Sequence, residues 1–261
     1  MLTTEPEHGA DLGDVGRARQ VYAATRDIWI GGGGWLEPHE RLGLLTVAAE
    51  LRPFSLLNHL DKKDWDTTIG VLSDFGLTCA PGIADFDYEV DVTGAESAVE
   101  AYMEHERKYP LEGLGVWGAP DGCATGGLSG LSSLLCYPEC CGAMDNRCKA
   151  HDHSAALQQL IDDADGDPEE IRRLLASGRG VLAWTEERDE WNKRLDRTRA
   201  MFPYALHTAC DECLDEGDKS ATGTINLLYR RLTLAVSAEL DLMIRWACEV
   251  ARLSATTSGP A

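Results

Sequence analysis

Apolar side chains recur at intervals of three and four positions along most of the chain, the spacing that places them on one face of a helix. The stripe is widest over residues 222–253, where Leu227, Leu234, Leu242 and Trp246 broaden it. We expect this segment to form one long helix at the centre of a bundle. The same spacing predicts further helices over 11–30, 38–52, 54–60, 64–75, 95–108, 156–161, 168–177, 181–201 and 203–216.

Short local signals indicate where several of these helices begin and end. Pro38 suits the first position of a helix, and Asp167 followed by Pro168 combines a capping side chain with a proline at the first turn. Pro203 is expected to open the helix that carries the last cysteine pair, and Gly217 to close it. The four consecutive glycines at 31–34 predict a flexible connector.

Extended structure is predicted in only a few places. Residues 84–92 alternate apolar and acidic side chains, the pattern of a half-exposed strand, and Leu114–Trp117 could form a short one. The sequence Cys79-Ala80-Pro81-Gly82 is typical of a turn. We therefore expect a mainly α fold, an irregular helical bundle with a small extended element. It would form one domain over 11–253, with a Gly/Cys-rich loop at 110–153 and disordered ends at 1–10 and 254–261.

Charge narrows the range of partners. The 261 residues include 44 Asp and Glu but only 24 Lys and Arg, which gives a formal net charge of −20. A field of this sign repels nucleic acid and anionic membranes, so we expect neither as a direct partner. No run approaches the ~18 apolar residues of a membrane helix, and the N-terminus lacks the apolar segment of a secretion signal. These features predict a cytoplasmic protein with reduced thiols.

Cysteine and histidine are concentrated in two segments. The first holds four cysteines and two histidines within eighteen residues: Cys136, Cys140, Cys141, Cys148, His151 and His153. The second holds His207, Cys210 and Cys213, with the Cys-x2-Cys spacing that lets a short turn aim two sulfurs at one ion. Clustered cysteines in a reduced protein favour metal ligation. We predict that the two segments meet around zinc, with Cys210 and Cys213 joined by two of Cys140, Cys141, Cys148 and His151.

Three functions remain open from the sequence. A closed zinc site would make the protein a metal-stabilised binding or regulatory module that acts through protein contacts, and this is the reading we prefer. A zinc ion with an open position near His151, His153 and His207 would instead indicate an enzyme, most simply a hydrolase, although no H-E-x-x-H is present. The cysteines could also hold an iron–sulfur cluster or act as a thiol redox sensor. Reaction, partner and oligomeric state are not specified.

Overall fold

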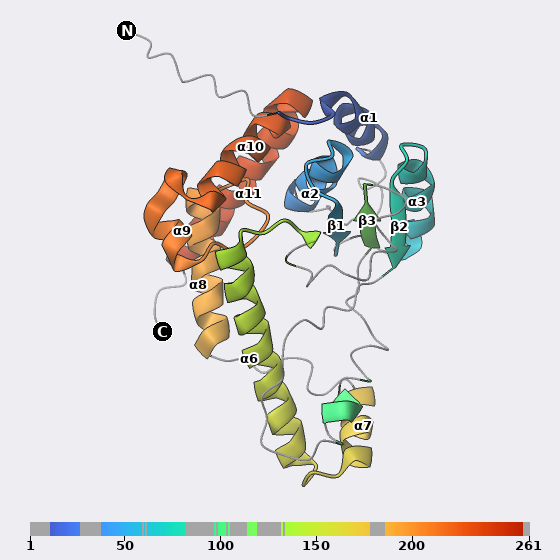
Figure 1. Ribbon diagram of the computed structural model, residues 1–261, viewed down its shortest axis with the longest axis vertical. Coiled ribbons are helices and arrows are strands. Elements are labelled where there is room, and N and C mark those ends of the chain that lie inside the picture. The colour runs from blue at the N-terminus through green and yellow to red at the C-terminus, as the bar shows by residue number, and fades with distance from the viewer. Residues whose placement is uncertain are drawn as a thin grey trace.

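The structure, a computed structural model, describes residues 11–26, 38–58, 60, 62–81, 97, 99–102, 104, 114–118, 132, 134–177 and 186–257 (Figure 1). Helices dominate it, and a small antiparallel sheet accompanies them, which confirms the predicted fold class. The helices are α1 (Val15–Thr25), α2 (Pro38–Ala48), α3 (Trp65–Ser73), α6 (Glu139–Asp163), α7 (Pro168–Ala176), α8 (Glu186–Met201), α9 (Asp211–Glu216), α10 (Ala221–Val236) and α11 (Ala238–Thr257). Short 3-10 turns cover η1 (Lys62–Asp64) and η3 (Gly217–Lys219).

The sheet has three strands in the order β1-β3-β2, namely β1 (Phe54–Leu57), β3 (Leu114–Trp117) and β2 (Thr78–Pro81). The short strand expected at Leu114–Trp117 is confirmed. The helix predicted over 54–60 is wrong, because the first four of those residues pair with β3 and bury Phe54 against the Trp117 ring at 4.8 Å between centroids. The turn predicted at Cys79 is wrong as well, because β2 is an edge strand, where Pro81 needs no ladder donor on its outer side.

The main core lies between this sheet and the helices around it. Apolar residues of α1, α2, α3, α10 and α11 pack together with β1 and β3 (Figure 1). Pro38 is the first residue of α2, as predicted, and every residue of that helix from Arg41 to Ala48 is buried. A helix buried on all sides fixes the position of the strand that follows it, β1.

Helix α6 extends away from this core and carries a second one at its far end (Figure 1). There Leu157 and Leu160 pack against Tyr102 and against Ile171 of α7. The predicted capping of α7 is confirmed, since the Asp167 side chain accepts the backbone N–H of Glu169 at 3.0 Å.

The loop predicted over 110–153 is wrong from Glu139 onward, because those residues form the first half of α6. This half has little apolar periodicity: only Cys141, Gly142, Met144 and Asp152 are buried between 139 and 153. With so few buried apolar side chains, a helix there leaves no hydrophobic signature in the sequence.

The C-terminal segment forms two helices rather than the single helix predicted. Ser237 adopts an extended conformation between α10 and α11, and its hydroxyl accepts the N–H of Leu240 at 3.2 Å. The residues expected to widen a buried stripe are exposed on both helices, from 45% at Leu227 to 71% at Trp246. The tail prediction over 254–261 is also corrected, since α11 continues to Thr257.

The helix predicted from Pro203 is wrong too, because residues 202–210 are irregular and α9 begins only at Asp211. Gly217 does end α9, with a positive φ of 61°. The predictions for 1–10, 31–34, 84–92 and 258–261 lie outside the described residues. None of the helices in the described ranges combines the length and apolar character needed to cross a membrane.

Candidate metal centre

Four cysteine sulfurs from two distant segments lie within 4.8 Å of one another. Cys140 and Cys141 come from the first turn of α6, while Cys210 and Cys213 come from the start of α9. The Sγ atom of Cys213 is 3.7 Å from that of Cys140 and 3.7 Å from that of Cys141. The adjacent pair, Cys140 and Cys141, is separated by 3.9 Å between sulfurs. The predicted meeting of the two cysteine segments is therefore present in the structure.

The start of α6 turns two neighbouring cysteines toward the same point. Pro138, with φ −52° and ψ 141°, stands just before the helix and directs the chain into it. Gly142 lies against Ser132, where an added Cβ would come within 3.2 Å of the serine Cβ, so a larger residue would press on this turn. The helix N-terminus also favours negative charge, which suits Cys140 and Cys141 as thiolates.

The second pair is arranged by a short helical turn. Cys210 is extended and stands immediately before α9, and Cys213 lies in its first turn, so the Cys-x2-Cys spacing brings both sulfurs to one side. The backbone N–H of Cys210 donates to the Cys141 sulfur at 3.4 Å. This bond ties the two segments together directly and would stabilise a thiolate at Cys141.

A third helix, α10, also contacts the sulfur cluster. Thr222, fully buried in the first turn of α10, has its hydroxyl 3.5 Å from the Cys141 sulfur and 3.0 Å from Nε2 of His207. The Ser220 side chain caps α10 by accepting the N–H of Gly223 at 3.0 Å. The cluster is thus enclosed by α6, α9 and α10.

The thiols differ in acidity. Burial, together with hydrogen bonds to Cys210 and Cys213, raises the pKa of Cys140 to about 11, and burial also raises the pKa of Cys141. Burial would raise the pKa of Cys213 as well, but hydrogen bonds with Thr222 and with the other two thiols outweigh it and lower that pKa to about 7. A thiolate thus forms readily at Cys213, while Cys140 and Cys141 need a cation to displace their protons.

The sulfur spacing matches coordination of one ion. Zinc–sulfur bonds of about 2.3 Å in a tetrahedron place neighbouring sulfurs about 3.8 Å apart. The three sulfur–sulfur distances, from 3.7 to 3.9 Å, agree with that edge. Disulfide sulfurs would be about 2.0 Å apart, and all four cysteines are free. The cluster can therefore hold a metal ion.

The other five predicted ligands lie outside this group of four. Cys136 is exposed, and His151 is exposed on α6. His153 lies near the middle of α6, where its Nδ1 is 2.5 Å from the Tyr102 hydroxyl. His207 is buried, and burial and the nearby Arg52 charge lower its pKa to about 4. Within the described ranges, no second group of three or more potential ligands is present.

The fifth of these residues, Cys148, is half-buried on the same face of α6 as Cys140. Both line a hollow of about 690 Å³ beside the cluster, together with Cys210. The rim carries an ion pair between Arg194 and Asp211, with 3.0 Å between Nη2 and Oδ2. The sulfur cluster therefore borders a surface depression at Cys140 and Cys210, while the Cys141 sulfur contacts buried Thr222.

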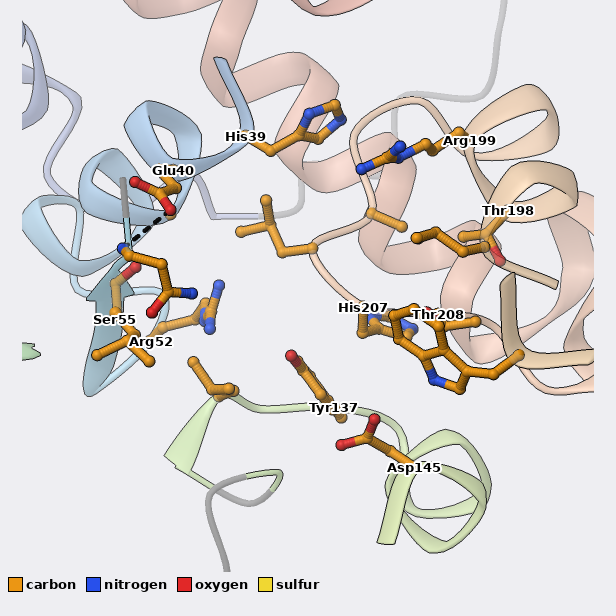
Figure 2. A pocket seen from close by; sticks show the side chains of 18 of the residues that line it. His39, Glu40, Arg52, Ser55, Tyr137, Asp145, Thr198, Arg199, His207 and Thr208 are labelled. Atoms are coloured by element: carbon orange, nitrogen blue, oxygen red, sulfur yellow. Dashed lines mark hydrogen bonds between the residues drawn. The ribbon is translucent and has the colours of Figure 1, made fainter. Parts of the chain in front are cut away.

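A separate cavity of about 470 Å³ lies next to the cluster (Figure 2). Figure 2 shows side chains from α2 and β1, from the start of α6, and from α8 and the segment after it around one space. Sequence reasoning missed its polar residues, among them Arg52, Tyr137 and Arg199, because they come from separate parts of the chain and form no motif. His207 links the two sites, since it lines this cavity and bonds to Thr222.

The donor atoms of the cluster indicate which metals it could hold. The cluster offers four soft sulfur donors, which suit zinc or iron, and no carboxylate belongs to it. No protein-family model, curated protein sequence or solved structure matches the chain.

Proposed function

We propose that Cys140, Cys141, Cys210 and Cys213 bind one zinc ion as a structural site. The observation that supports this most strongly is the triangle formed by the sulfurs of Cys140, Cys141 and Cys213. Its sides of 3.7, 3.7 and 3.9 Å fit one face of a tetrahedron, and the Cys210 sulfur lies within 4.8 Å of all three. A cluster containing several iron and sulfide ions must hold its cysteines farther apart than one ion does. The geometry therefore favours a mononuclear centre over an iron–sulfur cluster.

Four protein ligands also favour a structural role over a catalytic one. A catalytic zinc ion keeps one position for water and usually has three protein ligands. Here all four tetrahedral positions would be taken by thiolates, with Thr222 filling the space behind Cys141. The hydrolase alternative based on His151, His153 and His207 is disfavoured because none of the three histidines belongs to the group of four ligands. His153 contacts Tyr102 instead, and Nε2 of His207 is engaged by the Thr222 hydroxyl.

The ion would hold together parts of the chain that share few other contacts. The described contacts between α6 and the C-terminal helices run mainly through α8. Around the cluster itself, the apolar residues are few and include Met144, Phe202 and Leu214. Metal binding would thus contribute folding free energy directly at this junction.

We further propose that the zinc-stapled protein acts as a binding or regulatory module through protein contacts. Apolar side chains along one face of α11 support this: Leu242, Trp246, Val250 and Leu253 follow at helical spacing and are 40 to 71% exposed. Contiguous exposed apolar patches on a protein surface often mark sites of protein–protein contact. The charge of −20 disfavours nucleic acid as the partner.

The metal assignment is tested by elemental analysis of the purified protein and of two variants, Cys210→Ser and Cys213→Ser. We expect about one zinc per chain in the wild type and loss of most of it in both variants. Cys148→Ser is the matched control, because Cys148 lies on the same helix face but outside the group of four. Zinc retained in the two variants and lost in the control would refute the ligand set.

A further inference from the structure

The cavity of Figure 2 contains a buried positive charge that the described protein does not neutralise. Arg52 lies just before β1, is only 4% exposed, and lines the cavity. Figure 2 shows its guanidinium pointing into the space between the labelled side chains. Its Nε atom is buried and has no hydrogen-bond partner in the described structure. Burying a guanidinium without an anion is costly, so this arrangement indicates a missing negative charge.

The neighbours of Arg52 do not supply that charge. The Tyr229 hydroxyl is beside it: burial raises the pKa of this phenol, and the Arg52 charge acts in the opposite direction. A phenol is neutral at ordinary pH and can only accept a hydrogen bond from the guanidinium. His207, on the opposite wall, is buried as well and carries no negative charge in either protonation state.

The carboxylates in the cavity wall are already engaged. The Asp145 carboxylate is 3.0 Å from the ammonium group of Lys149, one turn farther along α6. The Glu40 carboxylate accepts the backbone N–H of Asn58 at 2.9 Å (dashed in Figure 2). Arg199 of α8 has no carboxylate within 4.0 Å among the described residues, so two arginines face the cavity without a paired anion.

The rest of the lining can hydrogen-bond an oxygen-rich ligand. Figure 2 places the hydroxyls of Ser55, Tyr137 and Thr208 around the same space as the two arginines. A volume of about 470 Å³ is within the range of small-molecule sites. It is too small for a folded partner but large enough for a metabolite.

We propose that this cavity binds a small organic or inorganic anion through Arg52 and Arg199, whose guanidinium groups would each bind carboxylate or phosphate oxygens of the ligand. Both carboxylate and phosphate match the planar fork of arginine donors. In a protein with a net charge of −20, a local positive site of this kind would also concentrate anions that the remaining surface repels. The anion would bind to residues distinct from the metal ligands, since neither arginine belongs to the sulfur cluster.

The test is isothermal titration of the full-length, metal-loaded protein with inorganic phosphate, with succinate and with succinamide at constant ionic strength. We expect saturable binding of phosphate or succinate, and none of succinamide, which has a similar shape without the charge. Arg199→Gln should weaken the binding by about tenfold or more, as expected for a lost charge-assisted hydrogen bond. Phosphate alone would indicate a phosphorylated ligand, and succinate alone a carboxylate.

Arg197→Gln is the control, because Arg197 is on the same helix and pairs with Asp211 and Asp215 outside the cavity. The affinity of Arg197→Gln for phosphate or succinate should stay within about twofold of that of the wild type. Arg52→Gln provides a second variant, with folding checked by circular dichroism and zinc content measured in parallel. The proposal is overturned if neither anion saturates, if succinamide binds equally well, or if Arg199→Gln binds as tightly as Arg197→Gln.

Discussion

Replacing Cys213 by serine tests how much the sulfur cluster contributes to folding. Cys213 is 3% exposed, and its sulfur is 3.7 Å from two of the other three. Serine keeps the side-chain shape but removes a soft thiolate ligand. Changes to groups that merely support a metal ligand typically reduce metal affinity by 10- to 100-fold, so losing a ligand itself should cost at least about 100-fold, or about 2.7 kcal/mol.

The loss should appear in thermal unfolding. For a protein of this size, each kcal/mol changes Tm by about 2–4 °C, so Cys213→Ser should unfold about 5–11 °C below wild type at matched zinc concentration. Cys136→Ser is the control, because Cys136 is exposed and outside the group of four, and it should stay within about 2 °C. The reasoning is refuted if the two variants unfold at the same temperature, or if adding a chelator lowers the Tm of Cys213→Ser as much as that of wild type.

Three further predictions follow from other contacts. Because the pKa of His207 is about 4 in the folded protein against an ordinary 6.5, the stability it contributes is present above pH 6.5 and lost as pH falls toward 4. His207→Gln should flatten this part of the stability–pH curve, by up to about 3 kcal/mol in urea unfolding, and an unchanged slope would contradict the assignment. Gly223→Ala should cost about 1–3 kcal/mol, because an added Cβ would lie 2.6 Å from the Gly217 carbonyl oxygen, whereas Gly70→Ala, with open space around it, should not destabilise the protein. Chelating the metal should weaken anion binding in titration, since the segment before α9 both lines the cavity and leads into the cluster, and equal affinities would show that the sites are independent.

Local signals predicted those parts of the fold that are decided locally. Pro38, Asp167 and Gly217 each act on their own helix end, so α2, α7 and α9 begin or end where these residues indicate. The run Phe54–Leu57 is different, because a four-residue run with three apolar side chains is compatible with a helix or a strand. Pairing with β3, nearly sixty residues later, decides that it is a strand, and no local pattern carries this information.

The metal centre was partly predictable for a chemical reason. Clustered cysteines favour metal ligation, so residue type alone predicted that the two distant segments meet. Residue type could not show which four of the nine candidate ligands form the group. That depends on α6 starting at Glu139, because the helix brings Cys140 and Cys141 to the cluster and places His151 and His153 farther along its length. The cavity was not predictable at all, since Arg52, Tyr137 and Arg199 are ordinary residues until the fold assembles them.

X-ray absorption at the zinc edge of the wild-type protein measures the proposed centre most directly. If Cys140, Cys141, Cys210 and Cys213 hold one ion, the spectrum will fit four sulfur neighbours at about 2.3 Å and no nitrogen or oxygen neighbour. A first shell containing imidazole nitrogen or water, a metal–metal distance, or zinc content far below one per chain would contradict it.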